Sequence, residues 1–417
     1  MTVGAGRADV DVVIVGGGVG GSAIGAALAE AGLAVEVLER TTEFEDRVRG
    51  EWMAPWGVAE AKRLGLYEAL VASGGHHLSR HIPYDERLDP AMAEARSIPL
   101  SVLFPEVPGP LCLEHVRIQE TLLERAGGLG AQVRRGVSDV QVEVGARNAG
   151  RVRFRHGGDT QELGCRLIIG ADGRSSTVRR QLGVTLEEAP VDHLIAGLLI
   201  DGAEGWPDDL QSMGQVRGIN YLVFPQGKGK IRLYADYDVA ERGRFSGNDG
   251  AKRLLEAFDM DCVPHSRAIA EARPIGPCRS YPSQDAWIDR PFGEGFVLMG
   301  DAAGYNDPII GQGLSITMRD ARLLRDALCE TSEWGADTFA PYAEERRERM
   351  RRLRFSARVV TQLYARFDAD SLARRGRALE RLFDPAGPAG ALIATYMGPE
   401  IVAEDSFSEE AFARLFA

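Results

Sequence analysis

The sequence contains few of the residues that disulfide-bonded, zinc-binding and nucleic-acid-binding proteins require. Its five cysteines are odd in number, are scattered along the chain and never form a CxxC pair. This spacing argues against a disulfide framework and against a zinc site, so no metal is expected. The formal net charge is -12 and the pI is about 5.3, which argues against a dominant nucleic-acid surface because such partners attract clustered positive charge.

Long apolar runs are also absent. No stretch reaches the roughly 18 apolar residues that cross a bilayer, and no signal peptide precedes the first apolar run. We therefore expect a cytoplasmic protein without stable membrane insertion. The length of 417 residues suggests two or three domains or one elaborated domain, and no internal repeat indicates a solenoid.

What is present begins with a β-turn-α-β pattern at the N-terminus. Residues 10–15, VDVVIV, form the apolar run of a buried strand, and GGGVGG turns the chain. SAIGAALAEAG then has helical periodicity, and LAVEVLER has the pattern of a second strand. The order of these segments is typical of a dinucleotide-binding unit.

The glycines and the acid of this unit each have a physical role. Gly16 permits the tight turn, Gly18 lets the backbone approach a pyrophosphate, and Gly21 lets the helix pack on the strand. Glu39, followed by Arg40, ends the second strand, where an acid binds a ribose hydroxyl pair. A glycine-rich turn alone is often a simple linker, but this context favours an adenosine diphosphate group, belonging to either FAD or NAD.

A second glycine-acid motif, LIIGADGRSSTVRR, contains Asp172. Taken alone, its Asp-Gly pair favours a simple turn. The following residues do not alternate in polarity and instead enter a helix, which makes a plain hairpin a poor interpretation.

A third motif, GDAAGYNDPIIGQGLSITMRDA, starts at residue 300. Asp301 ends a buried strand, where it can accept a hydrogen bond from a sugar-like chain. Pro308 follows, and Gly311 and Gly313 precede an apolar helix whose free amides, around Gly313 and Leu314, can face an electron-rich carbonyl or an anion. The alternative is a glycine-capped helix entry without a ligand.

These segments predict an α/β fold with a Rossmann-like domain, an interleaved antiparallel-sheet substrate domain and a helical C-terminal region. Alternating segments between 190 and 237 predict the antiparallel sheet. The expected boundaries are 1–80, 105–189 and 276–335 for the Rossmann-like domain, 81–104 and 190–275 for the substrate domain, and 336–417 for the helical region.

The three motifs, in this order, resemble those of the FAD-dependent aromatic hydroxylases of the para-hydroxybenzoate hydroxylase type, which are single-component flavoprotein monooxygenases. The resemblance rests on VVIVGGGVGGSAIGAALAEAGLAVEVLER, GADGRSSTVR and GDAAGYNDPIIGQGLSITMRDA. It implies non-covalent FAD, contacted again by Asp301, with Asp172 in a motif associated with FAD and NAD(P)H. It also places Arg49 at the mobile edge of the flavin and Pro308 beside the flavin ring.

The same resemblance implies the reaction. NAD(P)H reduces the FAD, O2 forms a flavin hydroperoxide, and one oxygen atom passes to an aromatic, phenolic or polyketide-like small molecule. Because the chain has only one GxGxxG, NAD(P)H is expected to bind transiently over the flavin.

Departures from the family pattern concern four positions. Gly304 replaces a usual histidine, and Ser315 replaces a usual asparagine. The family's cofactor-contacting arginine aligns with His115, while Arg117 lies two residues further on. Arg117 enters the set of candidate cofactor-binding residues with the choice between the two left open.

The substrate pocket is expected between the flavin and the sheet of residues 190–237. Tyr221 and Val223 share one strand face and Leu222 and Phe224 the other, so only one pair can line it. Two further side-chain questions stay open: whether Trp52 and Trp56 reach the site or only cap the FAD domain, and whether Arg217 or Arg232 pairs with a substrate carboxylate.

Two other flavoenzyme classes compete with the hydroxylase. RGEW and GDAAG suggest a flavin-dependent halogenase, but that class uses a lysine in the N-terminal domain and a WxWxIP segment. Lys62 is the only lysine before residue 228, and WxWxIP does not occur. An isoprenoid-type flavin reductase shares GDAAG, and a non-catalytic flavin-binding protein would keep the same fold.

Overall fold

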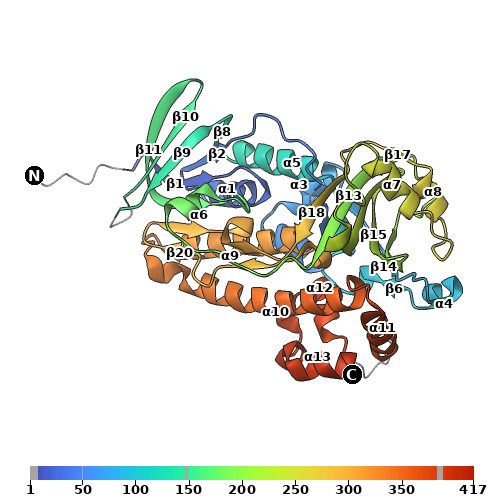
Figure 1. The fold of residues 1–417 in the computed structure, drawn as a ribbon. Helices are drawn as coiled ribbons and strands as arrows, with labels where there is room; N and C mark the ends of the chain where they lie inside the picture. Colours follow the sequence, from blue (N-terminus) through green and yellow to red (C-terminus); the bar gives the residue numbers. More distant parts are fainter. Residues whose placement is uncertain (1–7, 49, 146–148, 383–387) are drawn as a thin grey trace, which may run out of the picture.

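Two sheets lie side by side above a layer of C-terminal helices in this computed structural model, which describes residues 8–48, 50–145, 149–382 and 388–417 (Figure 1). The mixed sheet has the strand order β20-β21-β11-β1-β2-β8, and the second sheet has the order β17-β13-β16-β15-β14-β5-β6. The chain visits the second sheet twice, so the interleaved architecture predicted from the sequence is observed.

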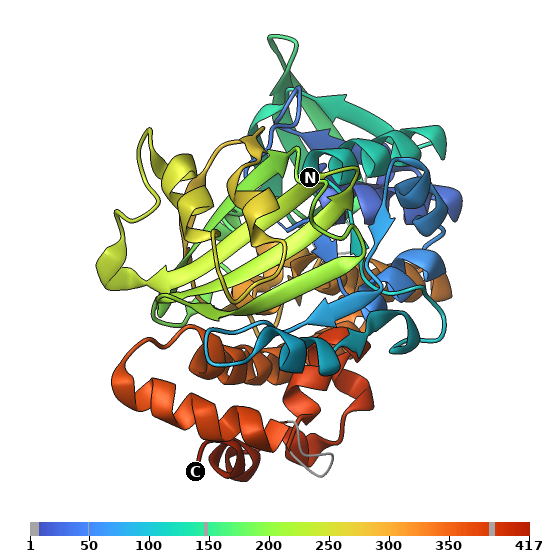
Figure 2. The same cartoon turned by 90° about the vertical axis from the view of Figure 1, so that its right-hand side faces the viewer.

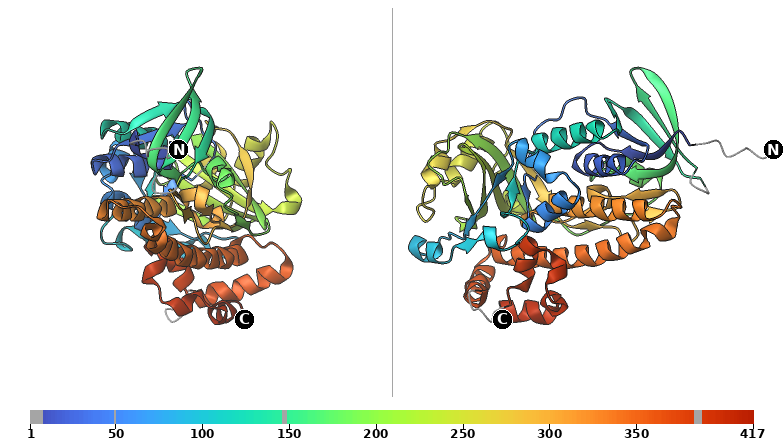
Figure 3. Two further views of the ribbon diagram at one scale, coloured as in Figure 1. Left: turned by 90° about the vertical axis from the view of Figure 1, so that its left-hand side faces the viewer. Right: turned by 180° about the vertical axis from the view of Figure 1, so that it is seen from behind.

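The mixed sheet is parallel at its centre because buried strands alternate with helices. β1 pairs in parallel with both β2 and β11, through Val13↔Glu36 and Val13↔Ile168. Helix α1 packs between α5 and α9, as the view from behind in Figure 3 shows. The bounds are β1 Val10–Val15, α1 Val19–Glu30, β2 Val35–Glu39, α5 His115–Gly128, β8 Gln132–Arg135, β9 Ser138–Glu143, β10 Gly150–His156, β11 Asp159–Gly170, β20 Phe292–Gly293 and β21 Phe296–Leu298.

The second sheet is mostly antiparallel, and its outer face packs against α7 and α8 (Figure 2). Its residues alternate strictly between that apolar core and the inner face. The strands are β5 Arg80–Ile82, β6 Ile98–Pro99, β13 His193–Asp201, β14 Leu210–Val216, β15 Ile219–Gly227, β16 Lys230–Asp238, β17 Arg273–Pro274 and β18 Arg279–Ser283, and the helices are α7 Gly250–Ala257 and α8 Ser266–Ala270. The sheet therefore extends to residue 283, beyond the expected boundary at 275.

The described part of the chain from residue 313 onward is mainly helical, as predicted. Its long helix α10 runs below the mixed sheet toward the second sheet, and α12 packs on α10 (Figure 1). The bounds are α9 Gly313–Glu330, α10 Ala340–Tyr364, α11 Ala369–Leu382, α12 Gly390–Met397 and α13 Glu409–Phe416. Within the part of the chain that the structure describes, no helix has the length and apolarity to cross a membrane.

Candidate active site

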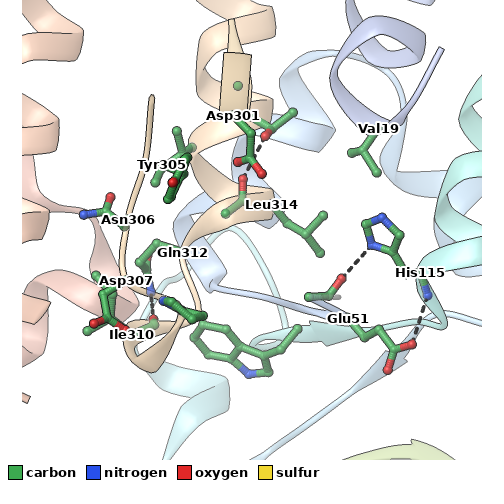
Figure 4. Close-up of a pocket in the computed structure, with 18 of the residues that line it drawn as sticks. Val19, Glu51, His115, Asp301, Tyr305, Asn306, Asp307, Ile310, Gln312 and Leu314 are labelled. Atoms are coloured by element: carbon green, nitrogen blue, oxygen red, sulfur yellow. Dashed lines mark hydrogen bonds between the residues drawn. The ribbon is translucent and has the colours of Figure 1, made fainter. Parts of the chain in front are cut away.

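A large cavity of about 1650 Å³ is lined by residues of both sheets. One end is bordered by the turn after β1, and the other by the inner face of the second sheet and by α12. The three motifs of the sequence all line it, through Gly16, Asp172 and Asp301 among others. Figure 4 shows Asp301, Leu314 and His115 around its centre.

The turn after β1 has the close backbone approaches that its glycines predict. Gly16 has φ +105°, and an added Cβ would lie 2.5 Å from the Ala171 carbonyl oxygen. A Cβ on Gly21 would lie only 1.8 Å from the Gly16 carbonyl oxygen. At Gly18, in contrast, the nearest atom to such a Cβ is Gln119 Nε2 at 3.8 Å. The side of Gly18 that faces the cavity, at the N-terminus of α1, is therefore open, as the approach of an anionic ligand would require.

Glu39 lies at the end of β2 beside this turn, with 8% of its surface exposed. Its Oε2 accepts a hydrogen bond from the Gly17 amide at 2.7 Å, and its Oε1 accepts one from the Thr41 amide at 2.7 Å. A carboxylate has about four acceptor positions, so two remain for ribose hydroxyls. Arg40, next in the chain, is exposed and also lines the cavity.

Replacing Glu39 with alanine is expected to weaken FAD binding by about 1.5–3 kcal/mol, the range for hydrogen bonds to charged groups. Fluorescence titration of the FAD-free protein with FAD measures this loss. Glu43→Ala, which changes an exposed acid outside the cavity, is the matched control. An unchanged dissociation constant for Glu39→Ala would remove this acid from the adenosine site.

The other two acids, Asp172 and Asp301, both line the cavity. Asp172 caps helix α6, Thr177–Gln181, because its Oδ2 accepts from the Thr177 amide at 2.6 Å and the Val178 amide at 3.2 Å. Asp301 lies after β21 and lines the cavity, with Arg174 Nε 3.3 Å from its Oδ2. Asp172 thus stabilises the start of α6, and Asp301 lies across the cavity on the loop after β21.

The helix start after Asp301 presents backbone amides to the cavity. The first hydrogen bond at this end of α9 runs from the Ile316 amide to the Gln312 carbonyl at 2.9 Å, so the amides of Gly313 and Leu314 precede it. Leu314, Gly311 and Pro308 line the cavity, and Gly311 has φ +64°. This arrangement suits an electron-rich ligand edge, as the sequence motif predicts.

The two unusual residues of the third motif have steric explanations. Gly304 has φ +109°, and a Cβ there would lie 2.6 Å from the Ala286 carbonyl oxygen, so a histidine has no room. Ser315 Oγ accepts a hydrogen bond from the Ala54 amide at 3.2 Å and packs against Gly57. The close contact with Ala286 thus explains the glycine at position 304, and the contacts with Ala54 and Gly57 accommodate the serine at position 315.

Helix α5 turns His115 and not Arg117 toward the cavity. His115 and Gln119, four residues apart on one helix face, line it, whereas Arg117 is exposed and lies outside it. The His115 Nδ1 atom lies 2.9 Å from the Gly50 carbonyl oxygen. We therefore place His115, rather than Arg117, at the candidate site. Arg49 lies outside the described residues, and its role stays a prediction.

The second sheet settles which pairs of residues face the cavity. Leu222 and Phe224 line it, whereas Tyr221 and Val223 are fully buried in the core against α7 and α8. Trp52 also lines the cavity. Trp56 does not: it is buried and its Nε1 donates to Gln312 Oε1 at 2.9 Å.

Arg232 is buried and is bound by acids from the segment before β3, Trp52–Met53. Its Nε and Nη2 donate to the two Glu51 carboxylate oxygens at 2.6 and 2.7 Å, and Nη2 also donates to Asp46 at 2.8 Å. Burial raises the pKa of Glu51, an effect that the positive charge of Arg232 opposes. Arg232 thus links β16 of the second sheet to the segment that contains Asp46 and Glu51. Its charge is neutralised by these acids and is not offered to a substrate. Arg217 is exposed and donates to the Ala257 carbonyl oxygen.

A buried cluster of acids surrounds His193 behind Pro308. His193 Nε2 lies 3.5 Å from both Asp236 Oδ1 and Asp307 Oδ1. The Asp307 amide donates to Asp285 Oδ1 at 2.9 Å. Burial raises the pKa of Asp307 to about 7, although the neighbouring His193 lowers it. The contacts of His193 with Asp236 and Asp307 raise the pKa of His193 even though burial, the largest single effect, lowers it.

The raised pKa of Asp307 predicts a pH-dependent stability. Its carboxyl favours the protonated form in the folded state, so its contribution is fully present below about pH 4 and is lost as the pH rises through about 7. One pKa unit corresponds to 1.36 kcal/mol. As the pH rises from 4.5 to 8.5, the free energy of unfolding of wild type should therefore fall by on the order of 3 kcal/mol relative to that of Asp307→Asn. Thermal unfolding of both FAD-loaded proteins from pH 4.5 to 8.5 measures it. A pH-independent difference would contradict the prediction.

The fold and the cavity together indicate which class of ligand the protein binds. A glycine turn on a parallel sheet, an acid at the end of β2, and a second acid and helix start across the cavity form an extended dinucleotide site. The volume of this cavity and the donors and acceptors that line it are compatible with FAD. Residues 9–356 match the family described as FAD binding domain. The protein therefore belongs to this family of FAD-dependent monooxygenases and related oxidoreductases.

Known proteins resemble this chain over most of its length. Mouse (Mus musculus) squalene monooxygenase is 24% identical over 98% of this chain and 72% of its own. Aurachin C monooxygenase/isomerase from Stigmatella aurantiaca is 29% identical over 82% of this chain and 86% of its own. The crystal structure of p-nitrophenol 4-monooxygenase PnpA from Pseudomonas putida DLL-E4 superposes with a TM-score of 0.76, at 19% identity, over 98% of both chains. The structural likeness establishes the fold.

Proposed function

We propose that the protein is an NAD(P)H-dependent FAD monooxygenase that hydroxylates an aromatic small molecule using O2. The observation that carries this proposal is the large cavity, which joins the FAD-type glycine turn to a mostly apolar wall on the second sheet. FAD would supply the redox chemistry and the activation of oxygen. The chain's residues bind it, orient it and exclude water.

The proposed roles follow from position. Gly16, Gly18, Gly21 and Glu39 hold the adenosine end, and Asp301 binds the hydroxylated chain between the two ends. The free amides of Gly313 and Leu314 stabilise negative charge at the far edge of the ring. His115, Asp172, Arg40, Gly311 and Pro308 complete the wall, and Arg49 is proposed to act at the mobile edge.

The substrate end of the cavity is built to exclude water. Most of the side chains that the second sheet and α12 contribute to its wall are apolar or aromatic, among them Met213, Leu222, Phe224 and Leu392. Such a wall favours a largely apolar substrate and protects a reactive oxygen donor from water. The names of similar proteins include both an aromatic compound, p-nitrophenol, and an isoprenoid, squalene, so alkene epoxidation is the second candidate.

A halogenase is disfavoured by the position of Lys62. Its Nζ donates to the Glu106 carbonyl at 2.7 Å and lies 5.2 Å from the centre of the Tyr67 ring, and it is not part of the cavity wall. No lysine among the described residues lines the cavity.

Purified, FAD-loaded protein should oxidise NADH or NADPH without a separate reductase, and a phenolic or polyketide-like aromatic should stimulate this oxidation. Oxygen uptake, NAD(P)H absorbance and product mass measure the reaction, with 18O2 as the label. A hydroxylated ring supports the main proposal, and an epoxide supports the second candidate. Halide incorporation, or a flavin that NAD(P)H does not reduce, would overturn the proposal.

A further inference from the structure

Part of the cavity lies among the C-terminal helices. Its wall there is made by residues of α10, α11 and α12 and of the segment that contains β6. In Figure 2 that segment, in blue, lies beside the C-terminal helices, in red. We call this part of the cavity the distal arm, and its apolar and aromatic lining residues include Ile98, Val360, Tyr364, Leu379, Leu392 and Ile393.

Helical spacing directs the lining residues of α10 and α12 toward the arm. Val360 and Tyr364 are four residues apart on α10, and Leu392 and Tyr396 are four residues apart on α12. Residues with this spacing lie on one face of a helix. Phe224 of the second sheet belongs to the same apolar cluster as these four residues. The arm is therefore continuous with the substrate wall on the second sheet.

A buried ion pair holds α11 at its place beside the arm. The guanidinium of Arg375 on α11 donates to both carboxylate oxygens of Asp85, which follows β5, and both side chains are buried. Arg87 Nη1 donates to the Leu372 carbonyl oxygen of α11 at 2.8 Å. Loss of one partner of a buried ion pair is costly, so these contacts keep α11 against the second sheet. The part of the arm that Leu379 lines is thus fixed by the fold.

The arm is poor in charge. Among the described residues of α10, α11, α12 and 96–103, Arg96 is the only charged one that lines the cavity, and it already has a partner within the protein. The polar side chains near the arm bond to one another: Trp52 Nε1 donates to Gln211 Oε1 at 2.8 Å, and Gln211 Nε2 donates to the Tyr396 hydroxyl at 2.9 Å. A hydrocarbon gains free energy by burial in such surroundings, whereas a charged group loses its hydration.

The volume of the cavity leaves room for such a hydrocarbon. Pockets for one small molecule are usually about 300–1,000 Å³, whereas this cavity has about 1650 Å³. FAD and the ring that it oxidises account for the part between the glycine turn and the second sheet. The arm is a poor site for water, because a buried water molecule needs several polar partners.

We propose that the distal arm binds an uncharged hydrocarbon tail of the substrate, an alkyl or prenyl chain attached to the ring that is oxidised. This inference rests on the proposed monooxygenase function and narrows its substrate class to ring compounds with such a tail. A ring compound without a tail would leave the apolar wall of the arm uncovered. A charged tail would be desolvated there.

A series of 4-alkylphenols, from 4-ethylphenol to 4-hexylphenol, tests this inference. Changes in flavin absorption and fluorescence measure each dissociation constant with FAD-loaded protein, without NAD(P)H. We expect each added methylene group to tighten binding by about fourfold, which corresponds to about 0.8 kcal/mol. A total gain of less than about tenfold across the series, or binding of no member, would overturn the inference.

Two pairs of variants assign this gain to the arm. Ile393→Glu and Ile98→Glu place a charge at lining positions where the isoleucines are 44% and 36% exposed, so the fold should tolerate either change. Both should remove most of the gain while leaving the dissociation constant of 4-ethylphenol unchanged. Ile401→Glu and Val102→Glu, at more exposed positions outside the cavity wall, should keep the wild-type gain. A gain that persists in both arm variants would mean that the tail binds elsewhere, and would overturn the inference.

The binding series is independent of turnover. Dependence on chain length without oxygenation would reject the proposed function and support the arm as a hydrocarbon site. NAD(P)H-dependent oxygenation of ring compounds whose affinity does not depend on chain length would reject the arm.

Discussion

Replacing Arg232 with methionine is expected to lower the free energy of unfolding by about 3–5 kcal/mol, the cost of removing one partner of a buried ion pair. The variant leaves the Glu51 carboxylate, which is 2% exposed, without its two charged hydrogen bonds. The remaining contacts of Glu51, from Gln226 Nε2 and the His115 amide, are single uncharged donors. Thermal and urea unfolding midpoints of the FAD-free protein measure the loss.

The physical reason can be separated from a simple loss of packing. Glu51→Gln combined with Arg232→Met removes the stranded charge, so the double variant should be more stable than Arg232→Met alone. Arg267→Met breaks an ion pair with Glu271 in which both side chains are mostly exposed, and it should leave the midpoint nearly unchanged. If Arg232→Met were as stable as wild type, the Arg232–Glu51 ion pair would not stabilise the contact between the second sheet and the segment before β3.

The second large effect concerns substitutions of two glycines in the same turn, Gly21 and Gly18, which should weaken FAD binding for different reasons. Gly21→Ala places a Cβ 1.8 Å from the Gly16 carbonyl oxygen, so α1 must move away from β1. Both the unfolding midpoint and FAD binding should fall, the latter by more than about a hundredfold, or about 2.7 kcal/mol. Gly128→Ala, at the end of α5 with no atom within 4 Å of the added Cβ, is the control.

Gly18→Ala separates the ligand from the fold. The backbone there has φ -69°, and the nearest atom to the new Cβ is 3.8 Å away, so the FAD-free protein should keep its stability. FAD binding should nevertheless weaken, because the methyl group occupies the approach of the pyrophosphate. FAD titration and thermal unfolding of the same samples measure both effects. Normal FAD affinity in Gly18→Ala would exclude this side of the turn as the approach.

Local sequence was sufficient for the elements that depend on neighbouring residues. The apolar run of β1, the glycine turn and α1 follow from residues 10–30, and Glu39 ends β2 as its spacing predicts. Helical periodicity also separates His115 from Arg117, because residues 115 and 119 lie on one helix face and residue 117 lies on another. The interleaved visits to the second sheet were predicted from alternation in polarity.

By itself, then, the sequence determined a dinucleotide-binding fold with two further acid-containing loops, because those features depend on spacing along a strand or helix. Only the tertiary structure decided that Leu222 and Phe224 face the cavity, because period-2 alternation defines two faces without saying which one α7 and α8 cover. It also paired Arg232 with Glu51 and joined His81 to Tyr396 through Gln211. These partners are far apart in the chain, and only packing of the two sheets and α12 brings them together.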